Sequence, residues 1–294
     1  MHGKLRGVIA AIITPVSRTF EPDAGRLIDR AHNLLANGCD GLNLLGTTGE
    51  ATSFSLSQRR SVMEAVSRSG LPMDRLMVGT GAAALRDAVE LNRTAADLGF
   101  AGALILPPFY YKPITDDGVT CYLDAIAIAT ESRKLPLFLY NFPALSGTAY
   151  TPALTKTLVT QFGERIAGIK DSSGDLDYAR LVGAISPTLK VFPSNEGVLL
   201  RARAGEFAGC ISATANLNSA DCASAFNDGD GAALFRAITI REIFQGMPLV
   251  PSIKGLLAEL ENDDALGIMV PPLHPISTDE RRAILRQYLA VSHG

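Results

Sequence analysis

Short apolar runs alternate with longer amphipathic segments along most of this chain, and this alternation limits its fold more than any other feature. The apolar runs are expected to form buried strands at residues 7–16, 41–46, 76–79, 102–106, 137–140, 166–170, 190–192 and 209–212. Between them, apolar residues recur every three to four positions, which is typical of helices that bury one face. The expected helices cover about 24–36, 57–66, 85–98, 116–131, 152–162, 175–185 and 197–204, and a last one lies near Ala220.

The expected strands are nearly continuous runs of Val, Ile and Leu, as in a parallel sheet that is covered on both faces. Eight strand–helix units within the first 230 residues favour a (β/α)8 TIM barrel over an open doubly wound sheet. No G-x-G-x-x-G motif follows the first strand, so a dinucleotide-binding fold lacks its best support. We therefore expect residues 1–230 to form a catalytic barrel. Residues 231–294 are expected to form a C-terminal extension of three helices packed on the barrel.

Composition excludes several classes of partner. The chain is 47% hydrophobic and 19% charged, which suffices for a sizeable core, and its formal net charge of −3 without a Lys/Arg block argues against nucleic acid. No apolar stretch approaches the roughly 18 residues of a membrane span. The four histidines show no metal-ligand spacing, and the four cysteines form no C-x-x-C pair, so we expect no metal and a reducing, cytoplasmic location. Basic residues before the first apolar run resemble a signal peptide, but no cleavage site follows.

Lys170 ends the sixth apolar run, where a barrel of this kind places its chemistry. Burying an unpaired ammonium is costly, so an apolar strand favours the neutral amine. A neutral lysine amine attacks carbonyl carbons and forms imines. The alternative is a strand-end lysine that extends its ammonium to solvent or pairs with Asp171.

Two other strand ends carry groups that suit imine chemistry. Tyr140 ends the fifth run, and its hydroxyl could give and take a proton near the imine nitrogen, although tyrosine is also a common rim residue. The turn at 46–50, Gly-Thr-Thr-Gly-Glu, offers backbone N–H groups and the hydroxyls of Thr47 and Thr48 to a carboxylate. A plain strand-to-helix turn is the alternative there. Glu50 could orient the loop or cap a neighbour, and we do not expect it to be catalytic.

Four motifs on successive strands resemble one known family. They are Gly46-Thr-Thr-Gly-Glu50, Pro108-Phe-Tyr-Tyr111, Tyr140-Asn-Phe-Pro143 and Gly168-Ile-Lys-Asp171. In this order the chain resembles the dihydrodipicolinate synthase / N-acetylneuraminate lyase family over essentially its whole length. The resemblance implies a carbon–carbon lyase, a class I aldolase, that binds pyruvate or another 2-oxo acid as an imine on Lys170 and needs no other cofactor. It also implies a homotetramer, a dimer of dimers.

The same resemblance implies a role for each matching residue. Tyr140 matches the proton-shuttling tyrosine, and Thr47 and Thr48 match the pair that binds the 2-oxo acid's carboxylate. Tyr110 matches a tyrosine that reaches into a neighbouring subunit's site. Ile211 matches a position whose backbone carbonyl faces the bound substrate.

Leu145 departs from the synthase pattern. Synthases carry an arginine at this place, two residues after the proline of Tyr-Asn-x-Pro, which holds the carboxylate of the aldehyde substrate; a leucine cannot form that clamp. Residues 144–147 resemble instead the branch of sialic-acid lyases and 2-keto-3-deoxy-sugar-acid aldolases, whose aldehydes are polyhydroxylated. Hydroxyl partners would then follow the seventh and eighth strands, although each is equally compatible with an ordinary loop role; these are Ser194, Asn195, Glu196, Ser212 and Thr214.

The sequence therefore favours reversible aldol cleavage of a 2-oxo sugar acid, such as N-acetylneuraminate or 2-keto-3-deoxygluconate, to pyruvate and an aldehyde. One alternative is dihydrodipicolinate synthase, condensing pyruvate with aspartate semialdehyde, since an arginine from another loop could replace the missing one. An alternative of another class is a non-catalytic protein that binds 2-oxo acids. A phosphate-binding isomerase is disfavoured because residues 193–196 and 212–216 contain no glycine-rich cradle.

Overall fold

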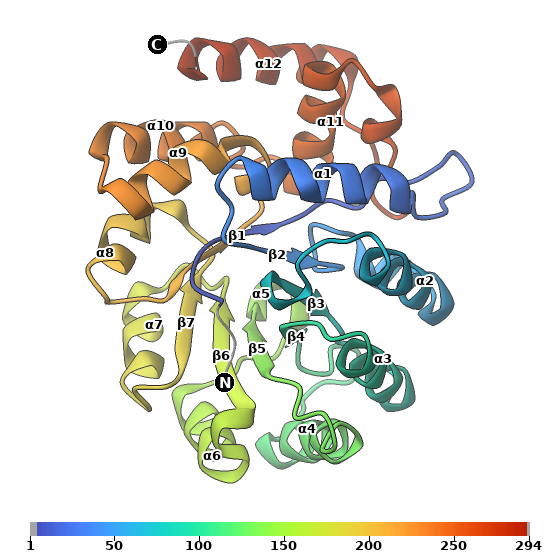
Figure 1. The fold of residues 1–294 in the computed structure, drawn as a ribbon, viewed down its shortest axis with the longest axis vertical. Helices are drawn as coiled ribbons and strands as arrows, with labels where there is room; N and C mark the ends of the chain where they lie inside the picture. The colour runs from blue at the N-terminus through green and yellow to red at the C-terminus, as the bar shows by residue number, and fades with distance from the viewer. Residues whose placement is uncertain (1–4, 293–294) are drawn as a thin grey trace.

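Eight parallel strands surround a common centre and helices enclose them (Figure 1). The structure, a computed structural model, describes residues 5–292, so His2, Lys4 and His293 lie outside the described part. The strands are β1 Gly7–Ala11, β2 Gly41–Leu44, β3 Leu76–Gly79, β4 Gly102–Ile105, β5 Leu137–Asn141, β6 Ile166–Asp171, β7 Lys190–Pro193 and β8 Gly209–Ser212. Each strand from β1 to β6 pairs with the next, and β1 also pairs with β8. Near β7 and β8 the N–H of Ala208 donates to the carbonyl of Val191 at 2.9 Å, so the barrel is nearly closed.

The fold confirms the predicted (β/α)8 TIM barrel. The helices are α1 Ala24–Ala36, α2 Leu56–Ser67, α3 Leu85–Asp97, α4 Asp116–Ala129, α5 Pro143–Ser146, α6 Pro152–Phe162, α7 Leu176–Gly183, α8 Leu199–Arg203, α9 Ala215–Asp228, α10 Gly231–Glu242, α11 Leu249–Glu261 and α12 Thr278–Ser292. Single 3₁₀ turns lie at Ala51–Ser53, Met73–Arg75, Gly163–Arg165, Glu196–Val198 and Asp264–Gly267. The first apolar run was expected to be a strand as far as residue 16, yet β1 ends at Ala11. The short helix α5 was not predicted.

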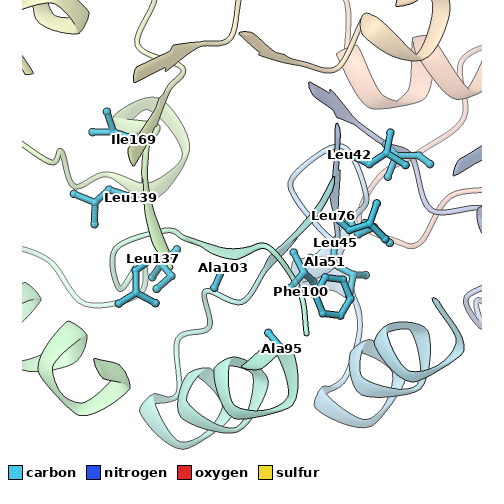
Figure 2. Close-up of a cluster of buried hydrophobic side chains, with 14 of the residues drawn as sticks. Leu42, Leu45, Ala51, Leu76, Ala95, Phe100, Ala103, Leu137, Leu139 and Ile169 are labelled. Atoms are coloured by element: carbon cyan, nitrogen blue, oxygen red, sulfur yellow. The ribbon is translucent and has the colours of Figure 1, made fainter. Parts of the chain in front are cut away.

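Strand alternation separates the barrel interior from the outer layer. On β5, Phe138 and Tyr140 belong to the interior cluster, whereas Leu137 and Leu139 belong to the cluster between strands and helices. Figure 2 shows Leu137, Leu139 and Ile169 directed away from the barrel centre. Because side chains alternate along a strand, Lys170, which follows Ile169, faces inward.

The last three helices, α10 to α12, extend the ring of helices beside α9 and α1 (Figure 1). We call residues 231–292 the C-terminal helices. Arg30 of α1 forms an ion pair with Glu261 at the end of α11, and the Tyr288 hydroxyl of α12 donates to the Leu217 carbonyl of α9 at 3.0 Å. Across residues 5–292, no helix has the length and apolar character that crossing a membrane requires.

Candidate active site

A cavity of about 490 Å³ opens where the carboxyl ends of the strands meet the C-terminal helices. We call it the strand-end cavity. Its lining residues are Thr47, Thr48, Tyr140, Phe142, Leu145, Lys170, Asp171, Ser172, Ser173, Gly174, Leu176, Pro193, Ser194, Asn195, Ile211, Ala213, Arg241, Pro248, Leu249, Val250, Pro251 and Leu273. This is the end of the barrel at which enzymes of this fold place their chemistry.

Lys170 lies at the base of the strand-end cavity and is only 4% exposed. It is in register with Tyr140 of β5 and Phe192 of β7, so these three side chains share the interior face. The Lys170 Nζ lies 4.4 Å from the centre of the Tyr140 ring. Within the described part of the chain, no hydrogen bond or ion pair engages this nitrogen. An amine that is buried beside an aromatic ring, with no carboxylate partner, is suited to act as a nucleophile.

Asp171 does not pair with Lys170, which was the alternative that the sequence left open. Its carboxylate accepts hydrogen bonds from Asn141 Nδ2 at 2.8 Å and from the Ser173 hydroxyl at 2.9 Å. Burial raises the pKa of the Asp171 carboxyl, and these hydrogen bonds oppose that shift. The carboxylate next to the lysine in sequence thus stabilises the loop after β6 and leaves the amine free.

The Tyr140 hydroxyl lies 3.4 Å from the Thr47 Oγ1, so the side chains at the ends of β5 and β2 meet above the lysine. Thr47 and Thr48 both line the cavity. Among the hydrogen bonds of residues 5–292, none engages the backbone N–H of either threonine or the Thr48 hydroxyl. The turn after β2 therefore presents unused donors to the cavity, as binding an anion requires.

The turn at 46–50 is anchored from behind by buried groups. The Thr14 hydroxyl donates to the Gly49 carbonyl at 2.9 Å, and Glu50, at φ 54°, has the left-handed conformation. The Glu50 carboxylate forms an ion pair with Lys254 of α11 and accepts the Val270 N–H at 2.8 Å. Burial lowers the pKa of Lys254, and the charge of Glu50 opposes that shift. Through its carboxylate, Glu50 thus connects the loop with Lys254 of α11 and with the backbone at Val270.

The residues after β7 and β8 divide into two groups. Ser194 lines the cavity, and its hydroxyl lies 2.6 Å from that of Ser172, a residue absent from the predicted site. Glu196 and Ser212, which were predicted to bind substrate, do not line the cavity. The fully buried Glu196 carboxylate accepts the Ser212 hydroxyl at 2.7 Å and also that of Thr214. They lie behind the wall because their polar atoms satisfy one another.

Arg241, near the end of α10, is a cavity residue that the sequence reading missed. Its Nη1 lies 3.0 Å from Glu196 Oε2, so the buried carboxylate holds one edge of the guanidinium. The side chain stays about one-third exposed and lines the cavity. No local pattern distinguishes Arg241 from other helical arginines, and only its contact with Glu196, 45 residues earlier, marks it.

Three further predicted residues take different places. Ile211 of β8 is fully buried and lines the cavity, and Leu145, in α5, lines the cavity while 60% exposed. Tyr110 is 76% exposed and lies outside the cavity lining, with its ring 5.3 Å from that of Tyr111. In a single chain, therefore, Tyr110 does not contribute to the cavity. Among the described residues, no three His, Cys, Asp or Glu side chains gather as metal ligands would.

Comparison with known proteins identifies the family of this chain. The family model of the dihydrodipicolinate synthetase family matches residues 4–288. A curated relative from Chloroflexus aurantiacus, named an uncharacterized DapA-like lyase, is 30% identical, and the alignment covers 98% of each chain.

Two solved structures share the fold. Dihydrodipicolinate synthase from Agrobacterium tumefaciens superimposes with a TM-score of 0.90 at 25% identity, covering 98% of this chain and 99% of that one. A variant of Sulfolobus solfataricus 2-keto-3-deoxygluconate aldolase superimposes with a TM-score of 0.86 at 20% identity, covering 98% and 96%. The family match over nearly the whole chain places this protein in the dihydrodipicolinate synthetase family of carbon–carbon lyases.

Proposed function

We propose that this protein is a pyruvate-dependent class I aldolase that reversibly cleaves a hydroxylated 2-oxo acid to pyruvate and an aldehyde. One observation carries the proposal: the unpaired amine of Lys170 lies at the base of a 490 Å³ cavity, 4.4 Å from the centre of the Tyr140 ring. Because a free amine beside a proton-transferring hydroxyl is what imine formation needs, no other cofactor is required.

The first half of the reaction forms the imine. The Lys170 amine adds to the 2-oxo carbon, and the resulting carbinolamine loses water. Tyr140 donates the proton that allows hydroxide to leave, and Thr47, 3.4 Å from the tyrosine hydroxyl, relays protons to and from it. The substrate carboxylate binds at the free N–H groups and hydroxyls of Thr47 and Thr48, and the carbonyl of Ile211 faces the reacting centre.

The second half breaks the carbon–carbon bond. Removal of the proton from the substrate's C4 hydroxyl releases the aldehyde, and the bonding electrons pass into the imine to form an enamine. Protonation of the enamine and addition of water then release pyruvate and restore the amine. The same steps in reverse give condensation, so the equilibrium and the reactant concentrations set the direction.

The cavity wall supports a hydroxylated aldehyde as second substrate. Ser172, Ser194 and Asn195 line it with hydroxyl and amide groups, which suit a polyol. Leu145, at the place where synthases carry an arginine, offers no carboxylate clamp. N-acetylneuraminate and 2-keto-3-deoxygluconate are the substrates we propose first.

Arg241 favours a second candidate, the condensation of pyruvate with aspartate semialdehyde by a dihydrodipicolinate synthase. Its guanidinium lines the same cavity and could bind the carboxylate that Leu145 cannot. The two candidates therefore differ in the charge of the aldehyde, which an assay with both substrate sets distinguishes.

The decisive experiment combines imine trapping with turnover. Borohydride added with pyruvate should fix a covalent adduct on Lys170, seen by mass spectrometry, and Lys170→Ala should abolish it. Tyr140→Phe keeps the ring beside the amine but should lower kcat by about 100-fold or more. No adduct in the natural protein, or an adduct that survives Lys170→Ala, would overturn the proposal.

Turnover is measured as pyruvate release from sialic acid, 2-keto-3-deoxygluconate and related acids, beside condensation with aspartate semialdehyde. Trapping without turnover of any of these would identify a non-catalytic 2-oxo-acid-binding protein instead.

The proposal also covers the oligomeric state of the protein and its location in the cell. We propose a homotetramer in which Tyr110 acts in a neighbouring subunit's site, because the side chain is exposed and lies outside its own cavity. The four cysteines are all free, and three of them are buried, which supports a cytoplasmic location.

A further inference from the structure

Lys254 lies on α11, far from Lys170 in the sequence, and its side chain is completely buried. Its Nζ donates to the Thr14 carbonyl at 3.1 Å and forms an ion pair with Glu50 Oε1. Glu50 in turn accepts the Val270 N–H with its other oxygen. One ammonium from the C-terminal helices therefore connects the segment after β1 with the turn after β2.

The position of these contacts matters because the same turn carries Thr47 and Thr48, which line the strand-end cavity. Glu50 closes the turn with its N–H donating to the Thr47 carbonyl at 3.1 Å, and it has a left-handed φ of 54° that non-glycine residues adopt rarely. A strained residue keeps such a conformation only where its surroundings enforce it. Lys254 and the Val270 N–H supply that enforcement through the Glu50 carboxylate.

We propose that Lys254 is a positioning residue for the carboxylate of the 2-oxo acid. By holding Glu50, it keeps the free N–H groups and hydroxyls of Thr47 and Thr48 directed into the strand-end cavity. The inference rests on the proposed function, because it presupposes that this turn binds the substrate's carboxylate. It makes the C-terminal helices a structural part of that subsite, and Lys254 acts there without touching substrate.

A merely structural role for Lys254 is the competing explanation. Removing one member of a buried ion pair destabilises a protein wherever the pair lies, so a lower melting temperature would not separate the two explanations. Selectivity for ligands that carry a carboxylate distinguishes the two explanations. A positioning role weakens only ligands that carry a carboxylate, whereas general loosening of the barrel weakens every carbonyl compound that reaches Lys170.

The experiment measures borohydride trapping on Lys170 with two carbonyl compounds, pyruvate and acetaldehyde, in the natural protein and in Lys254→Met. We expect the pyruvate concentration for half-maximal trapping to rise by about tenfold or more, the usual effect of losing charge-assisted hydrogen bonds. The acetaldehyde concentration should change by less than about twofold, because acetaldehyde has no carboxylate. In turnover, KM for pyruvate should rise more than kcat falls.

Arg30→Met is the matched control. Arg30 also forms an ion pair with a residue of α11, Glu261, but Arg30 lies away from the turn. The Arg30→Met variant should therefore be less stable, and the ratio of its two trapping constants should stay unchanged. If Lys254→Met does not fold, Glu50→Gln provides a milder test. Its neutral amide has one acceptor oxygen for the two donors, Lys254 Nζ and the Val270 N–H.

The outcomes are distinct. Equal loss of pyruvate and acetaldehyde trapping in the folded variant, or no loss of either, would overturn the positioning role. If the natural protein does not trap pyruvate at all, the proposed function itself fails.

Discussion

Leu145 is the single side chain whose identity most affects the choice of second substrate. It lies in the short helix α5, lines the strand-end cavity and is 60% exposed. An exposed side chain of this kind contributes little to stability, so it can be replaced without disturbing the barrel. The position is therefore suited to a direct test of aldehyde charge.

We predict that Leu145→Arg raises kcat/KM for aspartate semialdehyde by about tenfold and lowers it for uncharged polyhydroxy aldehydes. A guanidinium at this place forms the bidentate carboxylate contact that leucine cannot, and one charge-assisted pair is worth about 1.5–3 kcal/mol. Steady-state condensation assays with both aldehydes measure the change. Leu145→Met is the size-matched control, and an unchanged preference in Leu145→Arg would contradict the prediction.

At the scale of single residues, the sequence predicted those side chains whose position depends on a single strand. Lys170 and Tyr140 lie near the ends of strands whose alternation is readable, Thr47 follows another strand, and the structure brings the three together. Glu196, which was predicted to bind substrate, lies outside the cavity lining. Its carboxylate pairs with Arg241, which a helix of the C-terminal extension supplies, and local sequence holds no signal for a contact of that kind.

Among the elements, β6 depends on a close fit between glycine and an aromatic ring. A Cβ built on Gly168 would lie 2.8 Å from the Phe138 ring and 2.5 Å from the Lys190 carbonyl oxygen. A Cβ on Gly102 of β4 would lie 2.6 Å from the same ring. Phe138 of β5 thus fills the interior beside glycines of the two neighbouring strands, β4 and β6. It precedes Tyr140 by two residues.

We predict that Gly168→Ala lowers the free energy of unfolding by about 1–3 kcal/mol, because the methyl group has no space and must displace the ring or the neighbouring strand. It should also lower kcat, since Gly168 precedes Lys170 by two residues on the same face of β6. Urea unfolding and steady-state kinetics measure the two effects. Gly231→Ala is the control: a Cβ there meets nothing within 4 Å, so stability should stay unchanged or rise slightly.

Helices and strands were predictable where the spacing of apolar residues agrees with the residues that typically begin or end such an element. Helix α6 follows Thr151, whose hydroxyl accepts the Leu154 N–H, and Pro152 at its first position; its predicted range was correct. The expected first strand was too long because apolar character continues after Ala11, while Ile13 and Val16 leave the sheet to pack elsewhere. Hydropathy alone cannot separate a buried strand from a buried loop.

For the molecule as a whole, buried thiols and phenols link stability to alkaline pH. Burial raises the pKa of Cys39 to about 12 and that of Tyr122 to about 12. Because the unfolded chain loses these protons near pH 9 and 10, the folded state binds more protons in the interval up to about 12. Unfolding then releases protons, so the free energy of unfolding falls as pH rises through that window.

We predict that the urea midpoint is nearly constant from pH 7 to 8 and falls steadily from pH 9 to 11. Tyr122→Phe should make this fall shallower, by about 1.3 kcal/mol between pH 9 and 11, because phenylalanine has no proton to lose. At pH 8 the variant should be less stable, since the Tyr122 hydroxyl donates to the Ala82 carbonyl at 2.9 Å. An equally steep fall in both proteins would show that other groups control alkaline unfolding.

The last prediction concerns assembly, because Tyr110 is exposed in one chain and lies outside its own cavity. If Tyr110 acts in the site of a neighbouring subunit, two inactive variants should complement each other. A subunit with Lys170→Ala still supplies Tyr110, and a subunit with Tyr110→Phe still supplies Lys170. In a mixed pair with two-fold symmetry, one of the two sites therefore regains both residues.

Random pairing makes about half of all dimers mixed, each with one restored site, so co-expression of the two variants should recover about a quarter of the natural activity. The separate variants, mixed without subunit exchange, should show only their residual activities. If Tyr110 instead acted within its own chain, no subunit in the mixture would hold both residues in one site. Activity would then stay at the residual level, which assigns the tyrosine to the chain that carries it.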